Sequence, residues 1–222
     1  HPEQWHTVPG LCYLTPNKEY KDNGIARVLN FAGLVPPEQS RFFNWSKPFV
    51  QLETTRGCFN TCAFCVSGGE KPVRTLSIES IRRRLQLIHA HGIKNVRVLD
   101  RTFNYNPRRA KELLRLFLEF HPDIRFHLEI HPALLSEELK EELSLLPKGL
   151  LHLEAGIQSL REPVLEKSRR MGKLSDALDG LRFLCALPNM ETHADLIAGL
   201  PLYHLHEIFE DVRTLAGYAA GE

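Results

Sequence analysis

From Phe49 onwards, short apolar runs alternate with longer amphipathic stretches, and this alternation restricts the folds open to the chain. Five runs have the length and the residue types of strands. They cover residues 49–54, 95–99, 125–130, 150–156 and 192–199. The stretches between them are long enough for helical crossovers, which parallel strands need. The pattern therefore predicts an α/β fold, in which five βα units form one parallel, curved sheet with helices on its outer face.

Four of the amphipathic stretches begin with a residue that favours a helix start. These are Ser77 before residues 78–91, Asn106 followed by Pro107, Ser136 before two glutamates, and Ser175 before residues 176–187. In the first stretch, Arg82, Arg83 and Arg84 lie between apolar residues at helical spacing. We predict that these arginines form a solvated helix face.

The composition of the 222 residues excludes several classes of protein. Apolar residues make up 43% and charged residues 25%, which excludes disordered and fibrous chains. The formal net charge of +1 gives no reason to expect nucleic acid or an anionic membrane as the main partner. No apolar run approaches the roughly 18 residues that span a bilayer, and the first residues lack a signal-peptide pattern. We therefore predict a cytoplasmic protein.

The first 47 residues differ from the rest of the chain. They are rich in turn-forming residues and have little sustained periodicity,. We predict that residues 1–47 form a lead-in or linker outside the sheet and that residues 48–222 form the core. The chain begins at His1 instead of Met, which suggests a piece of a longer protein.

Three of the five cysteines lie close together, directly after the first predicted strand. Cys58, Cys62 and Cys65 form a CxxxCxxC array, whereas Cys12 and Cys185 stand alone. In a reducing compartment, such a cluster favours a metal site over disulfides. Three thiolates on one short loop can bind a single soft-metal centre.

Two kinds of metal centre can be weighed from the residues alone. A structural zinc ion needs a fourth ligand. The candidate ligands are His6, His89, His91, His121, His127 and His131, and none lies at the usual short spacing from the array. A ferredoxin-type cluster needs four cysteines, and neither isolated cysteine forms a second paired motif. Three cysteines without an obvious fourth ligand favour a four-iron cluster with one iron open to a small molecule.

The array, with Phe64 directly before its last cysteine, resembles the loop of the radical S-adenosylmethionine (SAM) superfamily. The resemblance runs from about residue 49 to residue 218. It implies that Cys58, Cys62 and Cys65 bind a [4Fe-4S] cluster whose fourth iron chelates SAM, and that Phe64 lies against the adenosine. It also implies a partial (β/α)6 TIM-like barrel, with five βα units visible and the chain ending before the sixth strand.

Within the superfamily, the chain is most similar to proteins that carry a cobalamin-binding domain ahead of the radical domain. These are labelled Fe-S oxidoreductases or Mg-protoporphyrin IX monomethyl ester oxidative cyclase-like proteins. Four phrases carry the similarity: ETTRGC at 53–58, DRTFN at 100–104, EAGIQS at 154–159 and DLIAGLP at 195–201. Residues 8–13 resemble the linker after the cobalamin domain, which implies that residues 1–47 follow a domain outside this chain.

The resemblance also implies contacts to SAM at the strand ends. Glu129 and Glu154 each close an apolar strand, where a carboxylate needs the mouth of the barrel or an arginine beside it. They are expected to bind the ribose hydroxyls, with salt-bridged structural carboxylates as the alternative. Arg170 is expected to pair with the methionine carboxylate, because a planar guanidinium suits that bidentate contact. Gln158 follows a glycine turn where the backbone can approach a ligand.

Three departures from the superfamily pattern concern the remaining contacts. Asp100 and Arg101 stand where a Gly-Gly-Glu motif normally holds the methionine amino group, and we expect them to bind the cofactor instead. The Gly68-Gly69-Glu70 sequence directly after the third cysteine is expected to be a turn. Only Ile197 and Gly199 match the GxIxGxxE pattern of the fifth strand. No histidine is assigned a catalytic role.

The implied function is that of a radical enzyme. A flavodoxin- or ferredoxin-type reductant supplies an electron, SAM is reductively cleaved, and the 5′-deoxyadenosyl radical abstracts hydrogen from a small-molecule substrate. Two alternatives stay open: a cobalamin-dependent methyltransferase in the full-length protein, and a non-catalytic module that binds an iron–sulfur cluster or zinc. The sequence does not identify the substrate.

Overall fold

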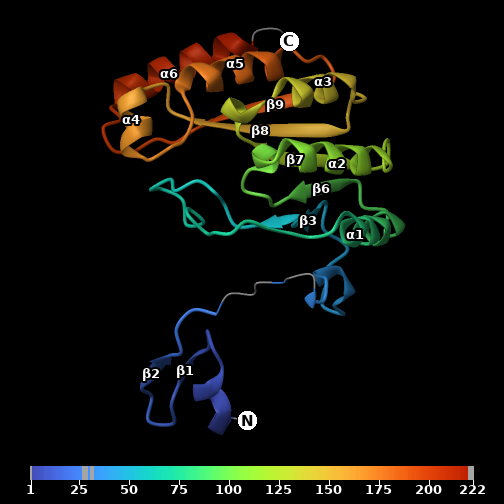
Figure 1. The fold of residues 1–222 in the computed structure, drawn as a ribbon, viewed down its shortest axis with the longest axis vertical. Helices are drawn as coiled ribbons and strands as arrows, with labels where there is room; N and C mark the ends of the chain where they lie inside the picture. Colours follow the sequence, from blue (N-terminus) through green and yellow to red (C-terminus); the bar gives the residue numbers. More distant parts are fainter. Residues whose placement is uncertain (1, 27–29, 31–32, 220–222) are drawn as a thin grey trace. The chain divides into compact units, whose positions relative to one another are not determined.

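The alternating pattern folds into a five-stranded parallel sheet, as predicted (Figure 1). The computed structural model describes residues 2–26, 30 and 33–219. The strands lie in the order β3-β6-β7-β8-β9. They span Val50–Leu52, Asn95–Val98, Arg125–Ile130, Leu151–Gln158 and Glu191–Leu196. The carboxyl ends of all five strands therefore meet at one edge of the sheet, where parallel α/β folds bind their ligands.

The described residues form six α-helices, of which five lie between strands of the sheet and the sixth follows the last strand. They are α1 (Ile78–Ala90), α2 (Pro107–Leu118), α3 (Glu137–Leu145), α4 (Glu162–Lys167), α5 (Leu174–Cys185) and α6 (Leu205–Ala219). Short 3-10 turns are η3 (Pro37–Gln39), η4 (Phe103–Tyr105) and η5 (Pro132–Leu134). The strand–helix alternation confirms the partial TIM-like barrel predicted from the sequence.

The two faces of the sheet differ in polarity. On β7, the apolar side chains of Phe126, Leu128 and Ile130 are buried, and Phe126 stacks on Phe117 of α2 with ring centroids 4.1 Å apart. The alternate residues of β7 are polar and partly exposed, and β8 alternates in the same way. Because successive side chains point to opposite faces of a strand, one face packs on helices and the other carries polar groups.

Three of the four predicted helix starts are confirmed. The side chains of Ser77, Asn106 and Ser136 each accept a hydrogen bond from a backbone N–H in the first turn of their helix. The fourth prediction is wrong, because α5 begins at Leu174 and Lys173 occupies the cap position without a side-chain bond. Ser175 lies inside the first turn and donates to Asp176 instead.

The arginine run on α1 is only partly a solvated face. Arg83 is exposed, but Arg84 is buried and its Nη2 lies 2.6 Å from Oε1 of Glu38, whose side chain is fully buried. Arg84 Nε also donates to Oε2 of Glu38 at 3.1 Å, and Nη1 donates to the carbonyl of Glu53 at 3.3 Å. The prediction fails for Arg84 because its partner lies 46 residues earlier in the chain.

The first and last strands are shorter than predicted. β3 ends at Leu52, and the chain then forms a two-residue strand, β4 (Thr55–Arg56), which pairs antiparallel with β5 (Arg74–Thr75). β9 ends at Leu196, so Ile197 and Gly199 lie beyond it. Gly199 has a φ of +86°, a conformation that ends regular strand structure.

The chain divides into two compact units, residues 1–34 and 35–222. In the first, β1 (Cys12–Leu14) and β2 (Tyr20–Asp22) form an antiparallel ribbon, preceded by η1 (Pro2–Thr7). Residues 35–47 of the predicted lead-in belong to the larger unit. The division into a lead-in that follows another domain and a core stays a prediction.

None of the helices in the described ranges is both long and apolar enough to cross a membrane.

Candidate functional site

The cysteine loop leaves the sheet at the carboxyl end of β3 and returns through the β4–β5 ribbon. Cys58 N donates to the carbonyl of Glu70 at 3.0 Å, which closes the loop at its base. Inside it, Cys65 N donates to the carbonyl of Cys62 at 3.1 Å. The predicted turn forms at Gly68, where a Cβ atom would lie 2.9 Å from the carbonyl oxygen of Cys62. Glycine is therefore required for the chain to pass this close to the cysteines.

The loop covers a cavity of about 150 Å³ at the carboxyl edge of the sheet. Nine of the predicted site residues line it: Cys58, Cys62, Phe64, Cys65, Arg101, Glu129, Glu154, Gln158 and Arg170. The other lining residues are Asn60, Gly68, Thr102, Ile130, His131, Gly156 and Asp195. In the described part of the chain, no three His, Cys, Asp or Glu side chains are arranged to hold a single metal ion.

Three predicted site residues do not line this cavity. The carboxylate of Asp100, which is 1% exposed, accepts hydrogen bonds from the backbone N–H groups of Thr54 and Thr55, both at 2.8 Å. Asp100 thus ties the end of β6 to the start of the cysteine loop. Ile197 N donates to the carbonyl of Gln158 at 3.0 Å, and Gly199 follows in the turn after β9. Their predicted contacts to a cofactor remain predictions.

Phe64 connects the cysteine loop to an apolar cluster. Its side chain lines the cavity and packs with Ile197 against the buried residues Val164, Leu200 and Tyr203. The cavity therefore has one aromatic wall supported by α4 and the segment after β9.

Three carboxylates gather on β7, β8 and β9. Glu129 and Asp195 lie next to last in β7 and β9. Glu154 lies in the middle of β8 and does not close the strand as predicted, because β8 continues to Gln158. Glu129 and Glu154 are register partners, and Glu154 forms hydrogen bonds with Asp195 and with Nε2 of His127 at 2.8 Å. Burial, and then the charge of Glu154, raises the pKa of Glu129. Burial and the hydrogen bond with Glu154 raise the pKa of Asp195 to about 6. Sequence reasoning missed Asp195 as a cavity residue, although it begins the DLIAGLP phrase.

The pKa of Glu154 shifts in the opposite direction to those of Glu129 and Asp195. Burial alone would raise its pKa, but hydrogen bonds from Asp195 and His127 hold the pKa below the usual value. Below about pH 6, Asp195 therefore carries the proton of this pair and Glu154 the charge,.

We expect the proton on Asp195 to make stability depend on pH. Because its folded pKa lies above the unfolded value, it stabilises the wild type at low pH, and this contribution is lost as pH rises through about 6,. The free energy of unfolding of the wild type should therefore fall relative to that of Asp195→Asn between pH 4 and pH 7. Urea unfolding at both pH values measures this. A difference that is constant or grows with pH would contradict the assignment.

Arg170 and Gln158 shape the backbone at Gly156. Arg170 Nη2 donates to the carbonyl of Gly156 at 2.8 Å. The strand is irregular between Gly156 and Gln158, and Gln158 has a φ of +73°. A Cβ atom at position 156 would lie 2.4 Å from Nε2 of Gln158. A glycine at position 156 therefore leaves room for both side chains at the cavity, and the close approach of a ligand to this turn stays a prediction.

Two buried residues of the cavity have side-chain polar atoms without partners. Asn60 and His131 are each 3% exposed, and both amide atoms of Asn60 and both ring nitrogens of His131 lack hydrogen bonds in the described structure. Oε1 of Gln158 is also unpartnered. Such atoms are costly to bury alone, at about 1–3 kcal/mol each, so they point to a polar ligand. Sequence reasoning assigned no role to Asn60, which occupies a variable position of the cysteine array, and considered His131 only as a zinc ligand.

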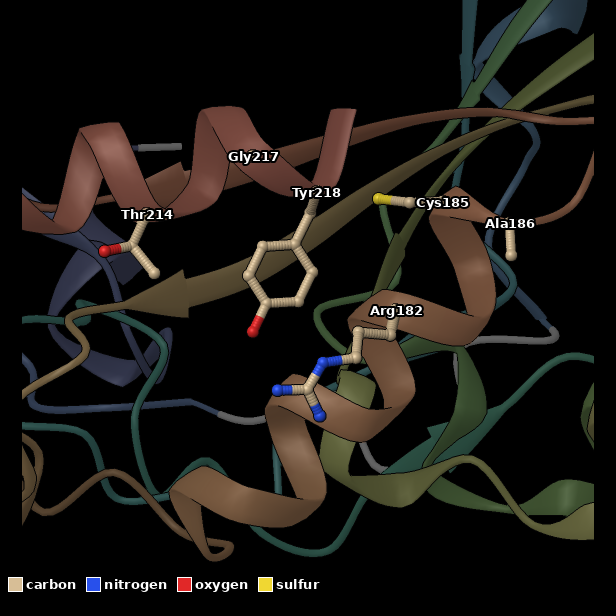
Figure 2. A pocket seen from close by; sticks show the side chains of 6 residues that line it. All are labelled: Arg182, Cys185, Ala186, Thr214, Gly217 and Tyr218. Atoms are coloured by element: carbon tan, nitrogen blue, oxygen red, sulfur yellow. The ribbon is translucent and has the colours of Figure 1, made fainter. Parts of the chain in front are cut away.

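A second, larger cavity of about 530 Å³ lies between α5 and α6. Figure 2 shows Arg182 and Cys185 on α5, with the Tyr218 ring of α6 beside them. The guanidinium carbon of Arg182 lies 5.3 Å from the centroid of that ring. Burial raises the pKa of the Cys185 thiol, which disfavours the thiolate that a metal needs. That Cys185 takes no part in the metal site stays a prediction.

Comparison with known proteins identifies the family. Residues 52–215 match the Radical SAM superfamily. The chain belongs to this superfamily. The matched range begins at the last residue of β3 and ends within α6. It includes the cysteine loop, the residues that line the cavity and the other four strands of the sheet. The resemblance inferred from the CxxxCxxC array is therefore confirmed at the level of the superfamily, and with it the cofactors that the superfamily implies, a [4Fe-4S] cluster and SAM.

Among curated radical SAM relatives, the chain is similar to enzymes described as methylthiotransferases. It is 28% identical over 190 residues to ribosomal protein uS12 methylthiotransferase RimO from Moorella thermoacetica, covering 79% of this chain and 43% of the relative. It is also 28% identical over 189 residues to tRNA-2-methylthio-N(6)-dimethylallyladenosine synthase from Herpetosiphon aurantiacus, covering 78% and 41%. The chain thus spans about two fifths of the length of these relatives.

Solved structures of radical SAM enzymes have the same fold. The cobalamin-dependent S-adenosylmethionine radical enzyme OxsB, with aqua-cobalamin and S-adenosylmethionine bound, matches 94% of this chain and 32% of its own with a TM-score of 0.70 and 21% identity. The radical S-adenosylmethionine methyltransferase TsrM from Kitasatospora setae matches 77% and 34% with a TM-score of 0.64 and 20% identity.

The cavity fits the two groups that the superfamily implies. Its three thiols come from one loop, as a soft iron centre requires. Its remaining walls offer an aromatic ring, carboxylates beside arginines, and the unpartnered polar atoms of Asn60, His131 and Gln158. A zwitterionic nucleoside derivative such as SAM has an aromatic base, hydroxyl groups and charged ends that match these features.

Proposed function

We propose that this radical SAM protein reductively cleaves S-adenosylmethionine and uses the resulting 5′-deoxyadenosyl radical to abstract hydrogen from a substrate. The observation that carries the proposal is the convergence of Cys58, Cys62 and Cys65 on the cavity that also contains unpartnered buried polar groups. The cluster, when bound, supplies the electron that breaks the carbon–sulfur bond. The protein supplies orientation and the exclusion of water.

Within this proposal, each wall of the cavity has a role in binding. The three cysteines hold the cluster, and Phe64 lies against the adenine ring. The hydrogen bond from Arg170 to the carbonyl of Gly156 fixes the position of the arginine side chain. The planar guanidinium is suited to the methionine carboxylate. Glu154 is the charged member of the Glu154–Asp195 pair and accepts a hydrogen bond from a ribose hydroxyl, with Glu129 beside it.

We further propose that the substrate is a small molecule and that the electron comes from a flavodoxin- or ferredoxin-type protein. The polar face of the sheet is suited to a polar substrate. His127, His152 and His193 lie there on adjacent strands, beside the carboxylates. All five cysteines are free thiols, which supports a reducing, cytoplasmic environment. The oxidoreductase or cyclase class of the reaction is part of this proposal.

The decisive test is anaerobic reconstitution with iron and sulfide, followed by reduction with dithionite in the presence of SAM. We expect absorbance of a [4Fe-4S] cluster and formation of 5′-deoxyadenosine and methionine, measured by chromatography. Protein that is treated identically without reductant is the control and should give neither product. A fully loaded, reduced protein that leaves SAM intact would contradict the proposal and favour a non-catalytic metal module.

A second candidate function is methyl transfer that depends on cobalamin. Its support is the structural match to TsrM, which is a radical S-adenosylmethionine methyltransferase and has been solved with cobalamin bound. The match to the cobalamin-dependent enzyme OxsB covers 94% of the chain and thus extends beyond residues 48–222. A longer protein that includes a cobalamin domain would be required. If the full-length protein methylates its substrate only when cobalamin is added, the result would favour this candidate over hydrogen abstraction alone.

A further inference from the structure

His131 is fixed in the cavity by its backbone and not by its ring. It follows directly after β7, and its N–H donates to Oδ1 of Asn104 at 2.8 Å. Asn104 Nδ2 donates in return to the carbonyl of His131 at 2.9 Å. Asn104 is itself 1% exposed. This reciprocal pair holds the main chain of His131, so neither ring nitrogen is needed to keep the residue in position.

The ring nitrogens of His131 have no hydrogen-bond partner among the described residues, although the ring is almost completely buried. The Met171 backbone lies near the ring and weakly favours the protonated form, but burial and the charge of Arg170 outweigh it and lower the pKa of His131 to about 4. Near neutral pH the ring is therefore uncharged and offers one donor and one acceptor. Both are available to a ligand in the cavity.

The surroundings of His131 connect it to the part of the cavity where Phe64 lies. Residues 168–172 follow α4 and lie next to both His131 and the cysteine loop at Phe64. A Cβ atom at Gly172 would lie 3.3 Å from Cε1 of His131. At the other end, the carbonyl of Ser168 accepts a hydrogen bond at 2.9 Å from the N–H of Ala63, the residue before Phe64. His131 and Phe64 are thus supported by the same short segment.

The charged and the uncharged side chains of the cavity suit different parts of SAM. Arg101 and Arg170 can meet the charged, amino-acid end of SAM, and Glu154 with Glu129 can accept hydrogen bonds from the ribose hydroxyls. Neutral His131 and the neutral amide of Asn60 cannot balance a charge, but they can complete hydrogen bonds to an uncharged group. The base and the ribose are the uncharged, hydrogen-bonding portion of SAM.

We propose that His131, with Asn60 as a second contact, recognises the adenosine portion of SAM through direct hydrogen bonds. This inference rests on the proposed function, because it takes SAM as the ligand. His131 is then a specificity residue for the nucleoside: a ligand that cannot hydrogen-bond to the ring leaves its nitrogens buried and unpaired, which costs affinity.

The test is calorimetric binding of S-adenosylhomocysteine and of 5′-deoxyadenosine to the cluster-loaded protein. His131→Phe keeps an aromatic ring but removes both nitrogens. We expect the variant to raise the dissociation constants of both ligands by the same factor, about five- to tenfold. This factor corresponds to the loss of one to two hydrogen bonds of ordinary strength. The melting temperature of the ligand-free variant should be unchanged or higher, because two unpaired buried atoms are removed.

His206→Phe is the matched control, since His206 is an exposed residue of α6 that lines neither cavity. It should change neither affinity. Wild-type affinity in His131→Phe would overturn the inference, and so would a loss confined to S-adenosylhomocysteine, because the lost contact would then be to its amino-acid end. In either case, wild-type protein that still forms 5′-deoxyadenosine leaves the proposed function standing. Wild-type protein that binds neither ligand would overturn the inference, whereas loaded, reduced wild-type protein that leaves SAM intact would overturn the proposed function.

Discussion

Replacing Cys62 by alanine is expected to abolish both the absorbance of the iron–sulfur cluster and the formation of 5′-deoxyadenosine. Cys62 is 5% exposed and lines the cavity together with the other two cysteines of the loop. With two thiolates left, the loop cannot bind three irons of one cluster. Iron analysis, visible absorbance and product chromatography after anaerobic reconstitution measure the effect. Circular dichroism should show an unchanged fold, because the sheet and its helices have their own apolar core.

Cys185→Ala provides the matched comparison. This cysteine lies in the separate cavity between α5 and α6 (Figure 2), so both the cluster and the product should stay at wild-type levels. Equal losses in the two variants would show that the effect is on folding and not on the cluster. Freshly reconstituted protein that holds zinc on Cys58, Cys62 and Cys65, without iron, would contradict the radical-enzyme proposal itself.

Arg84→Met is expected to lower the free energy of unfolding by about 3–5 kcal/mol. The substitution leaves the carboxylate of Glu38 buried without its guanidinium partner, and an uncompensated buried charge is among the most destabilising changes a protein can carry. The side chain of Glu38 is fully buried, and Arg84 contacts both of its oxygens. Urea unfolding at neutral pH measures the loss.

Arg83→Met on the same helix is the control. Its nearest carboxylate atom, Oε1 of Glu79, is 4.0 Å away and both side chains are exposed, so the change should stay within about 0.5 kcal/mol. The double variant Glu38→Leu, Arg84→Met should recover most of the stability, because it removes both charges together. If Arg84→Met costs no more than Arg83→Met, the buried pair has no special role.

The features that sequence predicted well are those set by local periodicity. The strands at 95–98 and 125–130 match their predicted ranges to within a residue, because alternation over several residues and a following helix cap leave few alternatives. The cysteine array likewise located the site, since three ligands on one loop must converge.

What sequence did not predict depends on contacts between distant residues. β4 and β5 are two residues each, too short for any periodicity, and they form only because residues 57–73 return to the same place. The sequence predicts that Arg84 is a surface arginine, because its partner Glu38 is distant in the chain. The roles of Asn104 and His131 depend in the same way on the mutual position of η4 and the end of β7.

The contrast between the two faces of the sheet separates the residues that keep the protein folded from those that could perform its chemistry. Within β7 and over residues 151–154 of β8, buried apolar side chains alternate with polar side chains that are only partly buried. Substitutions at His127, His152 or Glu154 therefore alter the polar face and leave the packing against the helices intact. A sheet built in this way can acquire new substrate preferences by single amino-acid changes, without first having to gain stability elsewhere.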